Sequence, residues 1–402
     1  MIKGCVCYGL AALFLFYIMA LQVSPSIMTE VLMNDFSIQA GALGVMASVY
    51  FYSYTLMQIP SGILLDRWSL ASLLSIACLI CSGGALLFGY TDHVQIAGLG
   101  RFLMGFGSAI AFVGVLTVAS LYFPHPYFAF FAGITQFLAA LGAIGGELPL
   151  AYFVNIYGWR QMSISLGIGG IFLAILIAFV MKGKKTVHQT AQFSVSLKRI
   201  FQWKQNYWIA LYAFTAWGPM AVFASLWGIP FVMSKYQLSN TDAAEAIMMM
   251  WLGLGVMSPF IGYLSDFARK RKIFLQLASV VGLFASLVAL YCQISLIGLY
   301  IALLLMGMAS GGQILCFPLI RENNSPAVAS TAMGLTNMAV VAGGAILQPL
   351  AGYFLSCFEA VGDVYSVHAY EISLILVPLC SCFGLIISFL IKETECLPVV
   401  FD

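Results

Sequence analysis

The stretch Gly62-Ile63-Leu64-Leu65-Asp66 recurs two hundred residues later as Gly262-Tyr263-Leu264-Ser265-Asp266. Three further matches follow in the same order, at offsets of 200 to 202 residues: Leu103-Met104-Gly105 with Leu305-Met306-Gly307, Gly133-Ile134-Thr135-Gln136 with Gly334-Leu335-Thr336-Asn337, and Pro149-Leu150-Ala151 with Pro349-Leu350-Ala351. One such match arises easily by chance in an apolar chain, whereas four in the same order indicate an internal duplication. The sequence therefore predicts two halves with the same fold.

The composition excludes a soluble protein. Hydrophobic residues make up 62% of the 402 residues and charged residues only 8%, whereas soluble domains are about 45–50% apolar. The net charge of +2 also excludes a nucleic-acid binder, which needs clustered Lys and Arg over much of its surface. The chain is therefore predicted to lie in a lipid bilayer, and at about 20 apolar residues per span it has room for about twelve helices.

Hydropathy and the repeat together predict an all-α membrane protein with twelve transmembrane helices in two six-helix bundles. Equivalent helices of two six-span halves run in the same direction, so the bundles are related by a pseudo-two-fold axis along the membrane normal. We expect an N-terminal bundle at 1–181, a polar, basic cytoplasmic linker at 182–205 and a C-terminal bundle at 206–402. The predicted helices are 7–33, 38–64, 70–90, 94–123, 126–154, 159–181, 206–233, 241–264, 273–292, 296–320, 326–355 and 371–391.

The basic residues predict the orientation, because cytoplasmic loops carry an excess of Lys and Arg. Fourteen of the 17 basic residues fall on the side of the two termini: Lys3, Arg67, six in 182–205, four in 269–272, Arg321 and Lys392. The other side receives only Arg160 and Lys235, and Arg101 falls inside a span. Both termini are therefore expected in the cytoplasm, and the absence of long loops is compatible with a bacterial inner membrane.

Several motifs carry a resemblance to the major facilitator superfamily of transporters. Residues 62–68 and 262–272 resemble the family's signature after helix 2 and its second copy, although Trp68 replaces the usual glycine; Leu99–Gly107, Gly142–Pro149 and Gly158–Arg160 resemble the signatures of helices 4, 5 and 6. Below the superfamily level, the chain is similar to the proteobacterial intraphagosomal amino-acid transporters of the Pht type.

The resemblance implies a conformational clamp at the cytoplasmic side. It would comprise Asp66 and Arg67 in the first half and Asp266 with Arg269 or Arg271 in the second. An aspartate there would cap a neighbouring helix and pair with a basic side chain, since helix N-termini favour anions. Alternatively, these residues are ordinary charged anchors in solvated loops.

Ionisable residues inside the membrane are costly and mark function by default. Arg101 and Glu147 are each expected about 10 Å from the same membrane surface, on consecutive helices, so they can meet, with Glu30 somewhat nearer that surface. One interpretation is structural: Arg101 ties its helix to backbone carbonyls, with Glu147 as its counter-ion, and Glu30 reaches water. The other is functional: Glu147 or Glu30 takes up a proton and releases Arg101 to a substrate anion.

Polar residues at helical spacing predict a central cavity. Gln22, Ser26 and Glu30 form a stripe on the first helix, and Tyr50, Tyr54 and Gln58 form one on the second. Gln136 and Asn337 occupy equivalent places in the two halves, so we expect both to line the cavity, together with Tyr54, Gln313 and Trp217. Packing or interfacial placement remains the alternative for Trp217.

The sequence therefore predicts a secondary transporter that works by alternating access and is coupled to protons. No Walker loop is present, no cofactor or metal is expected, and the small-molecule substrate is expected to meet a monomer. One cation and one anion near hydrogen-bonding groups suit a zwitterion, so uptake of an amino acid or small peptide is the first choice. Proton-driven export of a drug or siderophore-like compound is the alternative, and a membrane-embedded enzyme or sensor is an alternative of another class.

Overall fold

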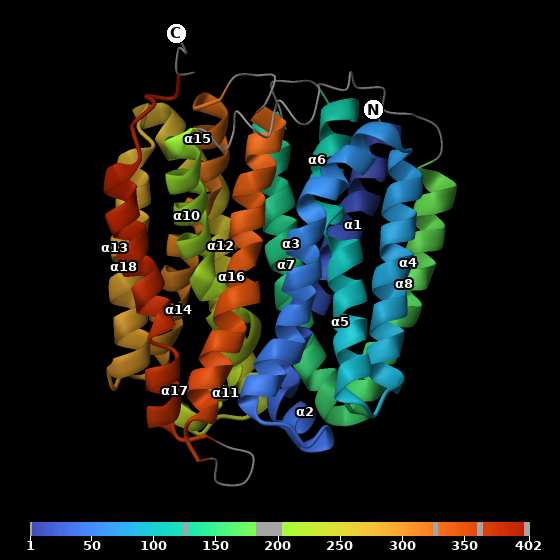
Figure 1. Cartoon of the computed structure of the whole chain (residues 1–402), viewed down its shortest axis with the longest axis vertical. Helices are drawn as coiled ribbons and strands as arrows, with labels where there is room; N and C mark the ends of the chain where they lie inside the picture. Colours follow the sequence, from blue (N-terminus) through green and yellow to red (C-terminus); the bar gives the residue numbers. More distant parts are fainter. Residues whose placement is uncertain (1, 124–127, 182–202, 325–328, 360–364, 398–402) are drawn as a thin grey trace.

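The computed structural model describes residues 2–123, 128–181, 203–324, 329–359 and 365–397, and its elements are helices (Figure 1). The first half contains α1 (Ile2–Val23), η1 (Ser24–Met28), α2 (Thr29–Asp35), α3 (Ala40–Arg67), α4 (Leu70–Tyr90), α5 (Val94–Ser108), α6 (Ala111–Tyr122), α7 (Phe128–Tyr157) and α8 (Trp159–Val180). The second half contains α10 (Lys204–Pro219), the π-helical η3 (Met220–Trp227), α11 (Gly228–Tyr236), α12 (Asn240–Ala268), α13 (Lys272–Tyr291), α14 (Leu296–Ser310), η4 (Gly311–Leu315), α15 (Cys316–Glu322), α16 (Ala329–Ser356), α17 (Val367–Ser373) and α18 (Leu376–Leu390).

These elements confirm the twelve predicted spans. Five of them are composite: α1–η1–α2, α5–α6, α10–η3–α11, α14–η4–α15 and α17–α18 each form one crossing. Within the described residues, eleven helices are long and apolar enough to cross a membrane. The twelfth crossing is α3, which runs beside the others (Figure 1) but carries tyrosine, serine and glutamine along its length. Most of the predicted linker, 182–205, lies outside the described residues.

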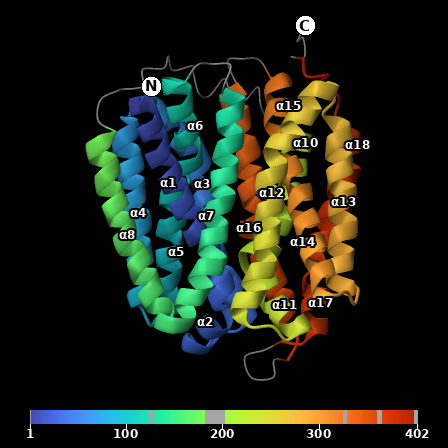
Figure 2. The same cartoon turned by 180° about the vertical axis from the view of Figure 1, so that it is seen from behind.

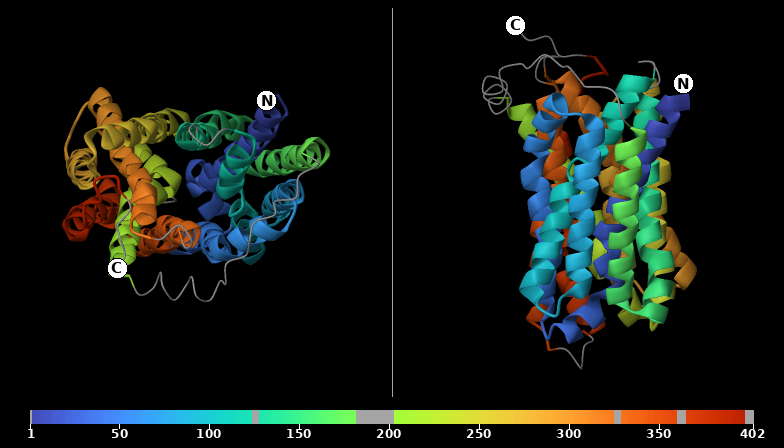
Figure 3. Two further views of the ribbon diagram at one scale, coloured as in Figure 1. Left: turned by 90° about the horizontal axis from the view of Figure 1, so that it is seen from above. Right: turned by 90° about the vertical axis from the view of Figure 1, so that its right-hand side faces the viewer.

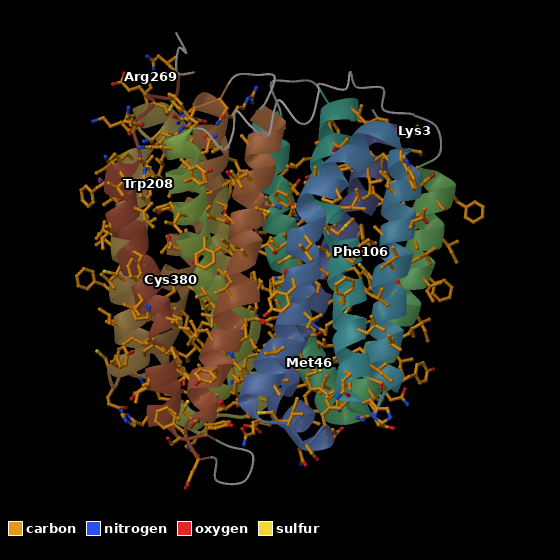
Figure 4. The ribbon with its side chains drawn as sticks, viewed as in Figure 1. Lys3, Met46, Phe106, Trp208, Arg269 and Cys380 are labelled. Atoms are coloured by element: carbon orange, nitrogen blue, oxygen red, sulfur yellow. The ribbon has the colours of Figure 1, made fainter. Side chains whose placement is uncertain are left out.

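The two halves stand side by side and meet along two seams. Helix α3 packs against α16 at one seam (Figure 1), and α7 packs against α12 at the other (Figure 2). The view along the helices separates the two groups (Figure 3). Helix α1 begins and α18 ends at the same end of the bundle, which we call the terminal face; the other end is the opposite face. Lys3 and Arg269 lie at the terminal face (Figure 4).

The packing repeats between the halves as the sequence does. Helix α5 lies so close to α3 that a side chain on Gly105 would overlap the carbonyl oxygen of Tyr50. In the second half, a side chain on Gly307 of α14 would overlap the carbonyl oxygen of Met250 on α12. Small residues permit this approach of backbones, which supplies packing where no hydrophobic effect drives helices together.

We predict that Gly105→Ala and Gly307→Ala each lower the stability of the fold. The added methyl group has to push two backbones apart, and overpacking of this kind costs about 1–3 kcal/mol. The midpoint of thermal denaturation in detergent should fall for both variants. Gly98→Ala on the same helix α5 is the control, because no atom lies within 4 Å of its new Cβ. An unchanged midpoint in both glycine variants would show that the contacts are looser than described.

Candidate functional site

A cavity lies between the halves, at the middle of the bundle. The space free of atoms there, together with the open solvent at its mouth, has a volume of about 580 Å³. Its lining residues are Leu15, Ile18, Met19, Gln22, Phe51, Tyr54, Phe112, Gln136, Ala139, Trp217, Gln313, Phe317, Asn337, Val340 and Val341. The structure thus brings together Tyr54, Gln136, Trp217, Gln313 and Asn337, which sequence reasoning assigned to one site.

The cavity wall is aromatic and amide-rich, and none of the lining residues that the structure describes is charged. Five aromatic rings alternate with the carboxamides of Gln22, Gln136, Gln313 and Asn337. Asn337 Nδ2 donates a hydrogen bond across the halves to Gln58 Oε1 at 2.6 Å. Within the described part of the chain, Gln22 Nε2 and Gln313 Oε1 are buried without a hydrogen-bond partner. Both atoms belong to residues that line the cavity and lack a hydrogen-bond partner within the described chain.

Sequence reasoning missed three phenylalanines of this wall, Phe51, Phe112 and Phe317. Phe112 begins the second segment of one broken crossing, α6, and Phe317 begins the equivalent segment α15. The shared Phe after each break is the signal that could have found them. It is weak, because phenylalanine is common throughout this chain, with 31 copies.

Arg101 is not among the described residues that line the cavity, and its expected role as a substrate contact stays a prediction. It is 1% exposed and donates to the carbonyl oxygens of Leu21 at 2.6 Å, Gln22 at 3.2 Å and Ala47 at 3.5 Å. Pro25 explains the first bond. Proline has no N–H, so the Leu21 carbonyl lacks the donor four residues ahead that a continuous helix would supply. Arg101 supplies a donor there, and the structural interpretation of this residue is the one that the geometry favours.

Glu147 is fully buried on α7 and faces the other half of the molecule. Its Oε1 accepts a hydrogen bond from Trp251 Nε1 on α12 at 2.9 Å, and its Oε2 has no partner among the described residues. No ion pair joins Glu147 to Arg101 in the described chain. Glu30 is half-buried on α2, beyond the η1 turn. The expected group of one arginine and two glutamates is therefore not formed.

Each buried ionisable residue is separated from the cavity by one aromatic pair. Arg101 lies 4.9 Å from the centre of the Tyr50 ring, which stacks on the cavity residue Tyr54 at 6.0 Å. Glu147 holds Trp251, which meets the cavity residue Trp217 edge to face at 6.1 Å. The aromatic pairs keep both ionisable groups close to the cavity without exposing either to it.

The clamp residues lie at the terminal face. Asp66 and Arg67 end α3, and their side chains lie outside the described ones. In the second half Asp266 pairs with Arg271 at 2.7 Å, while Arg269 is an exposed residue at the end of α12. Arg271 also pairs with Glu322 on α15 at 2.8 Å. Of the two arginines expected there, Arg271 is the one that the structure places against Asp266.

The residues that follow α18 complete this cluster. Glu393 accepts the backbone N–H groups of Arg271 and Lys272, where α13 begins, at 2.8 to 3.0 Å. Burial raises the pKa of Glu393, but these backbone hydrogen bonds outweigh it, and the net pKa lies below the ordinary value. The C-terminal segment thus supplies an anion to the start of α13, where free N–H groups favour one.

Twelve crossings in two like halves around a central cavity are the architecture of a secondary transporter. Residues 10–349 match the Major Facilitator Superfamily, and the chain belongs to that family. The family match and the fold together place it among the integral membrane transport proteins.

Curated relatives and solved structures agree with this assignment. The chain is 29% identical to the uncharacterized transporter YybO of Bacillus subtilis over 38% of its own length and 35% of that protein. The first curated relatives are thus matched over only about a third of their length. The benzoate transport protein of Acinetobacter baylyi matches at 22% identity over 90% of this chain and 84% of its own. A bacterial homologue of the human lysosomal transporter Spinster, crystallised inward-facing and unoccupied, superposes with a TM-score of 0.77 at 15% identity, over 98% of both chains.

We predict that Arg101→Lys destabilises the protein. A lysine ammonium is a compact point charge that does not span the carbonyls that a guanidinium bridges. At least one charged hydrogen bond is lost, at a cost of about 1.5–3 kcal/mol, and the thermal denaturation midpoint should fall. Arg321→Lys, at an exposed site on α15, is the matched control. Equal stability of the Arg101 variant and the wild type would contradict the anchoring role.

Proposed function

We propose that this transporter takes up a small polar solute, an amino acid or a small peptide, in symport with protons. Such a substrate is a zwitterion with no net charge. A neutral wall of carboxamides and aromatic rings suits it, because amide N–H groups can bind its carboxylate and amide oxygens its ammonium group. Aromatic faces also attract an ammonium group. The charge-free, amide-rich lining of the cavity is the observation that carries this proposal.

This reasoning differs from the one that the sequence suggested. There the charges of Arg101 and Glu147 were to hold the two ends of the zwitterion, whereas neither residue is among the described lining residues of the cavity. The free donor on Gln22 and the free acceptor on Gln313 take their place in the proposal. They lie on α1 and η4, in opposite halves, so a solute that bonds to both would bridge the halves.

Glu147 is the proposed proton-coupling group. It is sealed from water, receives one neutral hydrogen bond and has no cation partner in the described chain. An isolated charge in such surroundings costs several kcal/mol or more, so the carboxyl group is expected to carry a proton in this conformation. It lies at the α7–α12 seam, where movement of the halves would change its surroundings. A proton could then be released on one side and taken up on the other.

We propose that the terminal face is cytoplasmic and that this conformation faces inward. The two basic residues that the sequence assigns to the opposite face both have partners. Arg160 forms ion pairs with Asp35 and Asp92, and Lys235 donates hydrogen bonds to carbonyl oxygens at the end of α13. Hydrogen bonds between the halves also gather there. Asn240 donates to the Ile27 carbonyl at 2.6 Å, and Asn155 donates to Thr241 at 3.1 Å. These bonds support closure at the opposite face.

A second substrate class, the organic monocarboxylic acids, is favoured by the relative with the longest reported match, the benzoate transport protein. A single carboxylate that enters with one proton brings no net charge, so it too suits a neutral wall. Dicarboxylates suit the cavity less well, because no cation lines it. A quinolone resistance transporter from Acinetobacter baumannii is 28% identical over 35% of this chain, and its name keeps export as the alternative to uptake.

The proposal is tested by uptake into proteoliposomes with a proton gradient directed inward. Labelled L-phenylalanine, glycyl-phenylalanine, benzoate and galactarate are compared, each with and without the gradient. We expect accumulation of the amino acid or the dipeptide, abolished when the gradient is collapsed. Accumulation of benzoate alone would transfer the proposal to the second class, and gradient-driven expulsion of solute would overturn uptake.

Glu147→Gln should abolish gradient-driven accumulation and retain counterflow of solute between the two sides. The amide keeps the shape and an acceptor oxygen for Trp251 but cannot exchange a proton. Glu245→Gln, which changes an exposed glutamate near the start of α12, should accumulate solute as the wild type does. If the Glu147 variant accumulates solute normally, another group couples the proton.

A further inference from the structure

The Glu147–Trp251 hydrogen bond breaks the symmetry of the duplicated fold. By the repeat, Trp251 on α12 corresponds to Phe51 on α3. Glu147 on α7 follows Gln136 by eleven residues, and Gln348 on α16 follows the equivalent Asn337 by the same eleven residues. Both pairs of positions lie at the seams between the halves. An acid and an indole N–H are thus present at the α7–α12 seam, whereas the α3–α16 seam has an amide and a phenylalanine.

At the α3–α16 seam the corresponding contact is fixed by neutral groups. Gln348 Nε2 donates to the Ala221 carbonyl of the π-helical segment at 2.7 Å, and its Oε1 accepts from Ser48 across the halves at 3.4 Å. Gain or loss of a proton does not change an amide at ordinary pH. Of these two described contacts, the one at the α7–α12 seam is the one that a proton can change.

Trp251 connects that contact to the cavity. It is fully buried, its ring meets the Trp217 ring edge to face, and Trp217 lines the cavity. Trp251 itself is not among the lining residues, so a solute touches Trp217 and not Trp251. We propose that Trp251 is the positioning residue that transmits the protonation state of Glu147 to Trp217 and so to the substrate-binding wall; this rests on the proposed role of Glu147.

The physical step is a change in one hydrogen bond. When Glu147 loses its proton, its oxygens become charged, and a hydrogen bond to an ionised acceptor is shorter and about twice as strong as a neutral one. The indole N–H is then drawn toward α7. Because edge-to-face aromatic pairs have a preferred geometry, the Trp217 ring has to follow. Binding of a solute against Trp217 acts back on Glu147 by the same route, since linkage between two sites is reciprocal.

Other ionisable groups near α7 do not replace Glu147 in this step. On the elements packed against α7 they are Lys3, Cys5, Cys7, Tyr8 and Tyr17 of α1, Tyr122 of α6, Arg160 of α8, and Asp242, Glu245, Tyr263 and Asp266 of α12; α7 itself adds Tyr152 and Tyr157. Arg160 is engaged with Asp35 and Asp92, and Asp266 with Arg271. Tyr8 bonds to Thr135 on α7 at 2.8 Å. None of these groups forms a described ion pair with Glu147.

The test uses protons as the only ligand. The protein is labelled with fluorotryptophan in nanodiscs, and the fluorine resonances of its seven tryptophans are assigned by single Trp→Phe variants and followed against pH. In the wild type, we expect the Trp251 and Trp217 resonances to move together with one midpoint. In Trp251→Phe, the Trp217 resonance should stop responding to pH, although Glu147 is intact. Trp68, half exposed near the end of α3, is the reference for proper folding.

Two variants separate this inference from the function on which it rests. Trp227→Phe removes another buried indole N–H, which donates to the Gln348 carbonyl at 3.2 Å, and should leave both resonances responsive. Glu147→Gln should silence both. If Glu147→Gln leaves them responsive, or if neither moves in the wild type, the coupling role of Glu147 fails. If Glu147→Gln silences them but Trp217 still responds in Trp251→Phe, or Trp251 alone moves in the wild type, the transmission through Trp251 is overturned.

Discussion

Backbone polar groups that leave a helix inside a membrane must find partners, because no lipid can supply them. The fold depends on how this requirement is met at its breaks. Where Pro25 interrupts the first crossing, Arg101 donates to the released Leu21 carbonyl. Where the seventh crossing widens into a π-helical segment, Gln348 donates to the Ala221 carbonyl. Arg101 and Gln348 thus stabilise irregular backbone, and neither is among the described residues that line the cavity.

The sequence predicted the fold and much of the cavity because both follow from periodicity. Twelve apolar segments and a repeat of 200 residues determine which helices are equivalent, and equivalent places then identify Gln136 and Asn337 as a pair. The same reasoning failed for Arg101 and Glu147. Depth along a helix placed them at one level, but the direction of a side chain depends on helix rotation and on local backbone breaks. The need of the Leu21 carbonyl for a donor, created by Pro25, was visible in the sequence and was not used.

A neutral cavity with ionisable groups set one aromatic layer behind it reconciles two demands. A solute must be released as well as bound. Fixed charges in a small dry cavity would hinder release, because they would attract an oppositely charged solute strongly. A coupling group must nevertheless sense the solute. In the proposed mechanism, the Trp217–Trp251 contact serves the second demand without violating the first.

Glycine contacts make α3–α5 and α12–α14 into paired units with little freedom to part. Movement between conformations is therefore confined to the places where the halves meet, which differ in chemistry. If the two halves were identical, the α3–α16 and α7–α12 seams would move equally when the conformation changes. In the proposed mechanism, the acid–indole pair makes one line of contact respond to acidity, whereas the amide and the phenylalanine leave the other line indifferent to it.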